Sequence, residues 1–355
     1  MAPEMKNHAN VKIGRFCLGE RFPVFVIAEA GVNHNGRLEL AKKLIDAAQK
    51  AGADAIKFQT FKSESLVTAH APQADYQKRT SPYKDQLTML KELELSSNNF
   101  RELFLYCHRK KIMFLSTPFD EESVELLAEL NVPAFKVSSG DLTNFTLLKK
   151  IARYHKPVLL STGMATLAEV REAVECIYRS GNHQLILFHC TSNYPTAFND
   201  VNLKALRTLQ KKFHVPVGFS DHTVGIETAV AAVAMGCCVI EKHLTLDKNF
   251  DGPDHQASSD PREFQSLVNA IRHVEMALGD GQKKPTKSEE PIKRVARKSI
   301  VAVLDIAPGE KLTRAMLTVK RPGTGIEPKW LGKLIGARVR GPIKKDQVLS
   351  WPMVK

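Results

Sequence analysis

The stretch CVIEKHLT, residues 238–245, begins as an apolar strand and ends in the ionisable side chains Glu241, Lys242 and His243. It is the last of eight short apolar runs, each rich in β-branched residues and each followed by polar residues. The seven earlier runs are VFVIAEAG (24–31), AIKFQT (55–60), IMFLSTPF (112–119), AFKVSSGD (134–141), PVLLSTGM (157–164), LILFHCTS (185–192) and VPVGFSDH (215–222). Continuous apolar runs of this length predict strands that are buried on both faces, as in a parallel sheet.

Segments with helical spacing separate these eight runs. In LELAKKLIDAAQKAGA (38–53), for example, apolar side chains recur every three or four residues and therefore share one face of a helix. Eight strand–helix units in succession predict an α/β fold, a parallel (β/α)8 barrel of the TIM type. An open doubly wound sheet is the alternative, but the turn after the first strand, AGVNHNG (30–36), lacks the GxGxxG pattern of such sheets.

The composition changes after the predicted barrel, which we place at residues 1–280. Residues 281–294, GQKKPTKSEEPIKR, are polar without periodicity, and we interpret them as a linker. Residues 295–355 contain the short runs SIVAVLDI, LTVKRP and ARVRGPI between Gly and Pro turns. These runs predict a small, mostly β domain at the C-terminal end.

The net charge of +13 lies mostly in the C-terminal part, because residues 280–355 contain 18 Lys and Arg but 7 Asp and Glu. A basic surface suits an anionic substrate or a nucleic acid. Trp330 and Trp351 are the only aromatic residues there, which is too few for the stacking platform of a single-strand-binding protein. We therefore expect no nucleic-acid partner.

Two features bear on the compartment. No apolar run approaches the ~18–20 residues of a membrane span, and the start of the chain lacks the apolar core of a signal peptide. The six cysteines show no CxxC spacing and are expected to be reduced thiols. We therefore expect a cytoplasmic protein without a membrane partner.

The C-terminal ends of the strands of a barrel form one mouth, where functional side chains gather. Lys57 and Gln59 share a face of the second run, because strand side chains alternate, and Lys136 and Ser138 share a face of the fourth. A lysine within an apolar strand has to meet an anion or lose its charge. The two lysines therefore predict a phosphate or carboxylate ligand, with a Schiff-base lysine as the alternative.

Histidines end two neighbouring strands of the predicted barrel. His222 and His243 lie where two imidazoles can share one divalent ion. Glu241 or Asp254, or water and substrate, could complete the set of ligands. His189, on the sixth run, is either a third ligand or a packed histidine.

Glu29 ends the first strand and so belongs to the same mouth. One interpretation is an ion pair with Lys57 or Lys136. The other is a general acid or base that faces the reacting groups.

Eight motifs occur in order along the chain and together resemble one family. They are AEAGVNHNG (28–36), KFQTF (57–61), FLSTPFD (114–120), FKVSSGDLTN (135–144), STGM (161–164), HCTSNYPT (189–196), GFSDHT (218–223) and EKHLTLDKNFDGPDHQAS (241–258). The set resembles the bacterial sialic acid synthases, which condense phosphoenolpyruvate with N-acetylmannosamine. The C-terminal region with VKRPGTGI (319–326) resembles their antifreeze-like SAF domain, a β-clip fold.

The resemblance implies a domain-swapped homodimer and a role for each matching residue. It implies a divalent metal, Mn2+ or Mg2+, on His222 and His243, and a catalytic Glu29 that faces the sugar aldehyde and the attacking water. Phosphoenolpyruvate would be held by Lys57, Thr117, Lys136, Ser139 and Ser161. The sugar would meet Gln59, Tyr194, Asp254 and, from the partner subunit, Arg321. One departure is Ser192, which stands where some relatives have Asn two residues before the tyrosine.

The resemblance leaves more than one reaction open. N-acetylneuraminate synthesis is the favoured expectation, because the segment DGPDHQAS (251–258) and the C-terminal region look ordinary for that subfamily. A 2,4-diacetamido-6-deoxy hexose would instead give legionaminate, and another such sugar pseudaminate. A Schiff-base aldolase on Lys57 or Lys136 is a further alternative. A binding protein with an inactive barrel is disfavoured, because the acidic, basic and imidazole groups of the mouth are all present.

Overall fold

The computed structural model describes residues 10–73 and 85–355 of the chain. Its contacts divide the chain into two compact units, Met1–Gly279 and Asp280–Lys355, and each unit is described by itself. No helix in the part of the chain that the model describes combines the length and the apolar character needed to cross a membrane.

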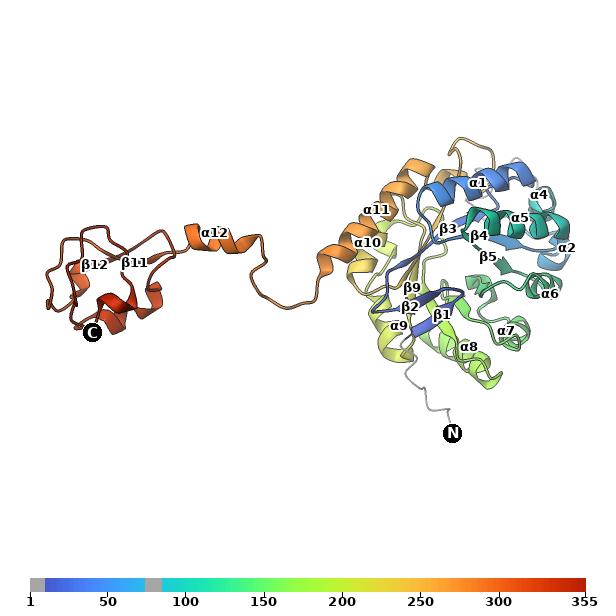
Figure 1. Ribbon diagram of the computed structural model, residues 1–355. Coiled ribbons are helices and arrows are strands. Elements are labelled where there is room, and N and C mark those ends of the chain that lie inside the picture. Colours follow the sequence, from blue (N-terminus) through green and yellow to red (C-terminus); the bar gives the residue numbers. More distant parts are fainter. Residues whose placement is uncertain (1–9, 74–84) are drawn as a thin grey trace. The chain divides into compact units, whose positions relative to one another are not determined.

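The first unit contains an eight-stranded sheet in which all paired strands are parallel (Figure 1). The strands are β3 (Phe25–Gly31), β4 (Ala55–Thr60), β5 (Met113–Pro118), β6 (Phe135–Val137), β7 (Val158–Ser161), β8 (Leu185–His189), β9 (Val217–Asp221) and β10 (Val239–His243). Their order is β5-β4-β3-β10-β9-β8-β7-β6, so the first and the last strands of the series, β3 and β10, pair with each other. The two strands at the ends of this order, β5 and β6, contact each other. The predicted TIM-type barrel is confirmed, and each of the eight apolar runs contains one strand.

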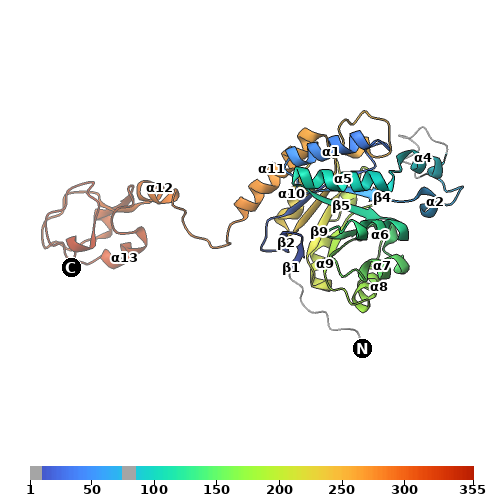
Figure 2. The ribbon, with the colours of Figure 1, turned by 45° about the vertical axis from the view of Figure 1, so that its right-hand side comes forward.

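Helices follow the strands and lie on the outside of the sheet (Figures 1 and 2). They are α1 (Leu38–Lys50), α5 (Ser97–Lys110), α6 (Glu121–Glu129), α7 (Phe145–Ala152), α8 (Leu167–Arg179), α9 (Ala205–Phe213), α10 (Glu227–Ala234) and α11 (Pro261–Leu278). Local capping explains several of their starts. At α8, for instance, Thr166 and Glu169 form a capping box, in which each side chain bonds the backbone N–H of the other residue. Two shorter helices, α2 (Ser63–Leu66) and α4 (Gln86–Leu93), precede α5.

Strand alternation separates two apolar clusters. On β3, Val26 and Ala28 join the cluster between sheet and helices, whereas Phe25 and Ile27 join the cluster inside the barrel. The next inward position along the same strand is Glu29. The inner face is thus apolar toward the N-terminal end of the strands and polar toward the C-terminal end, which is where a barrel carries its active site.

A hairpin that the sequence patterns did not reveal packs on the apolar inner cluster. It consists of β1 (Asn10–Ile13) and β2 (Phe16–Gly19), which pair antiparallel. Val11, Ile13 and Leu18 belong to the same buried cluster as the inner residues at the start of the barrel strands. The hairpin therefore covers the N-terminal end of the barrel.

The second unit has its own apolar core, built around β11 (Ser299–Ala302) and β12 (Leu317–Lys320). The run ARVRGPI forms isolated bridges, such as Val339 with Val354, instead of a strand. The segment 281–294, interpreted as a linker without periodic structure, contains most of helix α12 (Glu289–Ala296). Thr286 explains its start, because its hydroxyl accepts from Glu289 N and its own N–H donates to the Glu289 carboxylate.

Candidate active site

A cavity of about 390 Å³ opens at the C-terminal ends of the barrel strands. Polar side chains from every strand of the barrel, or from the loop that follows it, line this cavity. They are Glu29, Lys57, Gln59, Thr117, Lys136, Ser138, Ser139, Ser161, Ser192, Tyr194, Ser220, His222, Glu241 and His243. The barrel therefore brings into one cavity all but two of the site residues named from the sequence, and the two exceptions are Asp254 and Arg321.

Glu29 and Lys57 form a buried ion pair at the centre of the cavity. Lys57 Nζ lies 2.7 Å from Glu29 Oε2 and donates to Thr117 Oγ1 at 3.0 Å. Gln59 Nε2 donates to the other Glu29 oxygen at 3.3 Å. The ion pair that the sequence allowed for Glu29 is present, and it leaves the carboxylate inside the cavity.

Glu241 lies between the two lysines. Its Oε1 is 3.4 Å from Lys136 Nζ and 3.8 Å from Lys57 Nζ, and it accepts a hydrogen bond from Ser220 Oγ at 3.1 Å. Lys136 also donates to Ser161 Oγ at 2.7 Å. Sequence reasoning left the role of Glu241 open. The sequence did contain a signal that Glu241 belongs to the site. It lies two residues before His243 on the same strand, so both side chains are on the inner face.

The two carboxyl groups have opposite protonation tendencies. Burial raises the pKa of Glu29 to about 7, although Lys57 acts in the opposite direction. Burial also acts to raise the pKa of Glu241, but Lys136 and Lys57 outweigh it and hold the pKa below its usual value. Glu29 is therefore the carboxyl group that can exchange a proton near neutral pH, whereas Glu241 stays charged.

His222 and His243 lie side by side, with ring centroids 5.7 Å apart. His222 Nδ1 donates to the Thr191 carbonyl at 2.7 Å, which leaves Nε2 as the nitrogen with a free lone pair, 3.3 Å from Ser220 Oγ. Burial lowers the pKa of His222 to about 4 and that of His243 well below its usual value, so both rings are neutral at pH 7.

These two histidines fit one divalent ion only in part. Neutral imidazoles are good metal ligands, and His243 Nδ1 is a buried nitrogen without a hydrogen-bond partner among the described residues. Within residues 10–73 and 85–355, however, no group of three or more His, Cys, Asp or Glu side chains could hold a metal. Any ion on His222 and His243 would therefore need further ligands from water or substrate.

The remaining predicted sugar contacts lie beside these rings. The Tyr194 ring packs against His222, with centroids 4.2 Å apart and ring planes tilted by 35°. Asp254 follows β10, and its Oδ2 lies 3.9 Å from His243 Nδ1, while burial raises the pKa of Asp254 to about 6. Ser139, which the resemblance places around phosphoenolpyruvate and not at the sugar, also lines the cavity. Its hydroxyl accepts a hydrogen bond from the backbone N–H of Gly163 at 3.0 Å.

Three residues considered in the sequence lie elsewhere. His189 faces the helices, where it stacks on Phe219 and bonds the Val201 carbonyl, so it is a packed histidine and not a third ligand. Lys242 points away from the cavity and pairs with Asp221 at 2.8 Å. Arg321 is an exposed residue of the second unit.

Comparisons with known proteins match both parts of the chain to known families. The NeuB family model matches residues 44–283, and the SAF domain model matches residues 297–355. A Campylobacter jejuni protein named N,N′-diacetyllegionaminic acid synthase is 48% identical over 327 residues, which cover 91% of this chain and 98% of that protein. Human N-acetylneuraminate-9-phosphate synthase is 38% identical over 339 residues, which cover 95% of this chain and 94% of that protein.

Among solved structures, the N-acetylneuraminic acid synthetase of Leptospira borgpetersenii, in complex with citrate, is similar with a TM-score of 0.71. It is 36% identical in sequence, and the match covers 81% of this chain and 96% of that one.

Proposed function

The chain belongs to the NeuB family, and we propose that it condenses phosphoenolpyruvate with the open-chain form of an N-acyl amino sugar. The observation that carries this proposal is the group of two buried lysines and two carboxyl groups beside two neutral imidazoles. In the reaction, C3 of phosphoenolpyruvate bonds to the aldehyde carbon, water adds at C2, and phosphate leaves with cleavage of the C–O bond.

The chain's own residues account for most of the steps. Lys57 and Lys136 neutralise the charge of phosphoenolpyruvate, and Thr117, Ser139 and Ser161 supply hydroxyl groups around it. Glu29, with its pKa raised to about 7, takes a proton from the attacking water or gives one to the aldehyde oxygen as it becomes a hydroxyl group. The closed apolar layer below these residues holds both reactants at the mouth.

His222 and His243 would hold one divalent ion, Mn2+ or Mg2+, completed by water or substrate. When bound, this ion supplies Lewis-acid polarisation of the sugar aldehyde. A chelator is therefore expected to abolish phosphate release, and Mn2+ or Mg2+ to restore it. Turnover that persists in the chelator, together with borohydride trapping of pyruvate on a lysine, would instead support the Schiff-base aldolase.

For the sugar, we propose the 2,4-diacetamido-6-deoxy hexose that gives legionaminate. The support is the 48% identity with the C. jejuni relative of that name, against 38% with the human N-acetylneuraminate-9-phosphate synthase. N-acetylmannosamine, favoured from the sequence motifs, is the second candidate, because the 36% identical L. borgpetersenii structure bears the N-acetylneuraminic acid name.

A panel of three sugars tests this choice. Phosphate release from phosphoenolpyruvate is measured with N-acetylmannosamine and with the legionaminate and pseudaminate precursors. The legionaminate precursor is expected to give a kcat/KM at least 10-fold above the others, the size that one or two altered pocket contacts produce. An equal or higher kcat/KM for N-acetylmannosamine would reverse the assignment. No phosphate release with any of the sugars would overturn the proposed reaction.

We further propose a domain-swapped homodimer in which the partner subunit's Arg321 completes the sugar site. The support is the SAF domain match, which includes this residue, and its exposed guanidinium beside a Pro-Gly turn. Its role would be to contact the N-acyl group.

A further inference from the structure

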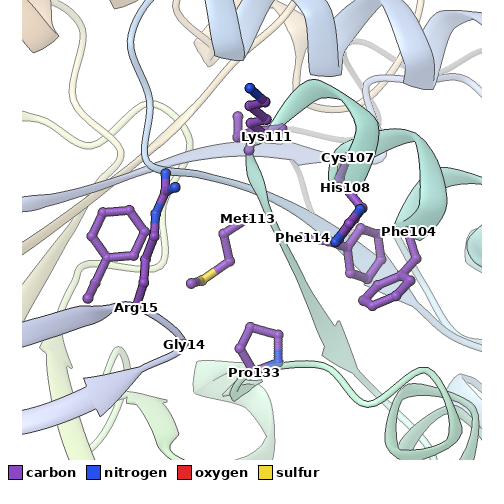
Figure 3. A pocket seen from close by; sticks show the side chains of 11 residues that line it. Gly14, Arg15, Phe104, Cys107, His108, Lys111, Met113, Phe114 and Pro133 are labelled. Carbon is purple, nitrogen blue, oxygen red and sulfur yellow. The ribbon is translucent and has the colours of Figure 1, made fainter.

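A second cavity, of about 580 Å³, lies at the N-terminal end of the barrel. It is bordered by the turn of the β1–β2 hairpin, the last turns of α5, the start of β5 and Pro133, which lies two residues before β6. In Figure 3, Met113 occupies the middle of the view, with Arg15 on one side, Phe104 and His108 on the other, and Pro133 below.

The walls of this cavity are apolar. Phe16, Phe104, Met113, Phe114 and Pro133 all border it. Protein interiors are close-packed, with few voids larger than a water molecule. A space of about 580 Å³ lies within the range of pockets that hold small organic molecules.

Positive groups stand around the apolar walls. Arg15 and Lys111 are exposed cations that border the cavity, and His108 borders it on the side opposite Arg15. The Arg15 guanidinium lies 4.9 Å from the centroid of the Phe16 ring. No acidic residue occurs among the described residues that line the cavity. The cavity therefore complements a molecule with an apolar body and an anionic group.

The cavity also adjoins a seam of the barrel sheet, between β5 and β6, where the described residues form no ladder of hydrogen bonds. β5 and β6 contact each other, but in the described residues they lie at opposite ends of the hydrogen-bonded strand order. Met113 and Pro133 stand at the two sides of this seam. On β5, Thr117 follows Met113 by four residues, or about 13 Å. Lys136, on β6, follows Pro133 by three residues, or about 10 Å of extended chain. Thr117 and Lys136 are two of the groups placed around phosphoenolpyruvate.

We propose that this cavity binds a small amphipathic anion, a ring or hydrocarbon body with one carboxylate or sulfonate, and that its occupancy changes the affinity of the mouth for phosphoenolpyruvate. A body wedged between the hairpin turn and the seam displaces β5 relative to β6, because no ladder of hydrogen bonds holds these two strands in register. The proposal has two halves. The binding half, that the cavity takes up the anion, is argued from the cavity alone. The coupling half, that occupancy changes the affinity for phosphoenolpyruvate, rests on the proposed function.

The probe is 8-anilinonaphthalene-1-sulfonate, a sulfonate on apolar rings, titrated by fluorescence into the full chain. One dye per chain is expected. The double variant R15E/K111E should weaken its affinity at least 10-fold. The control K12E reverses one charge on the same hairpin outside the lining and should change the affinity less than 2-fold. Arg15, Lys111 and Lys12 are exposed, so these variants keep the core.

Three results would overturn the binding half. The first is equal dye affinity in wild type and R15E/K111E. The second is full displacement of the dye by phosphoenolpyruvate, which would place the dye at the mouth. The third is a dye affinity that follows protein concentration through self-association, which would make the cavity a contact with a second copy of the chain.

The coupling half is tested by the KM for phosphoenolpyruvate at a saturating concentration of the best sugar, with and without saturating dye. A change of at least 2-fold is expected in wild type, and no change in R15E/K111E. An unchanged KM in wild type would overturn the coupling. A chain without synthase activity would overturn the proposed function, and then the dye titration alone decides whether the cavity is a site.

Discussion

Glu241 balances two buried ammonium groups, those of Lys57 and Lys136, through one oxygen atom. Its other oxygen, Oε2, has no hydrogen-bond partner among the described residues. Among the described residues, Glu29 supplies the other carboxylate at these lysines, at 2.7 Å from Lys57. Because the pKa of Glu29 is raised to about 7, Glu241 carries most of the compensating charge at neutral pH.

We predict that Glu241→Gln lowers the free energy of unfolding by about 3 kcal/mol. The substitution removes the carboxylate that compensates the buried charges of both Lys57 and Lys136. Phosphoenolpyruvate, an anion, should recover most of this loss, and so it should stabilise the variant more than the wild type. Thermal unfolding with and without phosphoenolpyruvate measures both effects. Ser220→Ala is the control, because it removes only a neutral donor to the same carboxylate, at a cost of about 1 kcal/mol. An equal ligand shift in all three proteins would contradict the prediction.

His34 shows how burial of a neutral imidazole affects stability. Its side chain is 1% exposed, and its Nδ1 accepts a hydrogen bond from the Gly36 N–H at 3.1 Å. Burial lowers the pKa of His34 to about 3, whereas the unfolded chain has a histidine pKa of about 6.5. Between these values the unfolded chain binds a proton that the folded chain does not. The contribution of His34 to stability is therefore complete above about pH 6.5 and is lost as the pH falls toward 3.

We predict that His34→Gln, which keeps an acceptor for Gly36, removes this dependence. The difference in unfolding free energy, wild type minus variant, should be lower at pH 5 than at pH 7 by about 2 kcal/mol, which is about 1.4 kcal/mol per pH unit below 6.5. Urea unfolding at the two pH values measures it. Other buried groups, such as His255 and Asp254, titrate in both proteins and cancel in the difference. A difference that is the same at both pH values would contradict the assignment.

At the scale of one element, adjacent side chains of β10 point to opposite faces of the sheet and make different contacts. Glu241 and His243 face the cavity, whereas Lys242, between them, faces the helices and donates to Asp221 Oδ2 and to the Thr223 carbonyl. Asp221 in turn accepts from the Thr223 hydroxyl. The ion pair of Lys242 with Asp221 is therefore part of the support of the barrel, outside the cavity.

We predict that Lys242→Met lowers the unfolding free energy by about 3 kcal/mol, because it leaves the buried Asp221 carboxylate without its cation. The double variant D221N/K242M should recover part of this loss. For both variants, kcat/KM measured well below the melting temperature should stay within about 3-fold of wild type. A larger loss of kcat/KM in a folded variant would place Lys242 in the reaction after all.

At the scale of the whole molecule, the chain joins a barrel that carries the candidate active site to a second unit with its own core. The second unit also carries most of the net positive charge. Arg321 is the residue of that unit for which we propose a role in the sugar site. If this role is played across a domain-swapped dimer, two variants with different defects should complement each other when their subunits are mixed.

We predict that Arg321→Ala raises the KM for the sugar at least 10-fold without loss of stability, and that Glu29→Gln lowers kcat at least 100-fold. If the partner subunit's Arg321 completes each barrel, subunit exchange between the two impaired variants should form dimers with one intact site, which is measured at a sugar concentration well below the KM of Arg321→Ala. Activity of the mixture should then exceed that of either parent several-fold. A mixture no more active than its parents, under conditions where exchange is demonstrated by mass labels, would contradict the swapped arrangement.

Sequence patterns predicted the elements well and the pairing of side chains less well. The eight strands lie within the eight apolar runs, because a strand buried on both faces has to be apolar along its whole length. The β1–β2 hairpin was missed, since NVKI and FCLG are too short to stand out before their apolar face meets the barrel interior. Helix α12 was missed because its charged residues obscured a short apolar face and the Thr286 cap.

The sequence by itself determined that eight strand–helix units form a barrel, and that lysines, histidines and a glutamate end up at one mouth. Spacing of two along a strand decides which face a side chain takes, and the C-terminal ends of parallel strands meet at one end of a barrel. Only the tertiary structure decided that Glu241 bridges Lys57 and Lys136, and that His189 packs against helices. It also revealed the cavity at the β5–β6 seam. These facts depend on distances between strands far apart in the chain, and local periodicity carries no information about such distances.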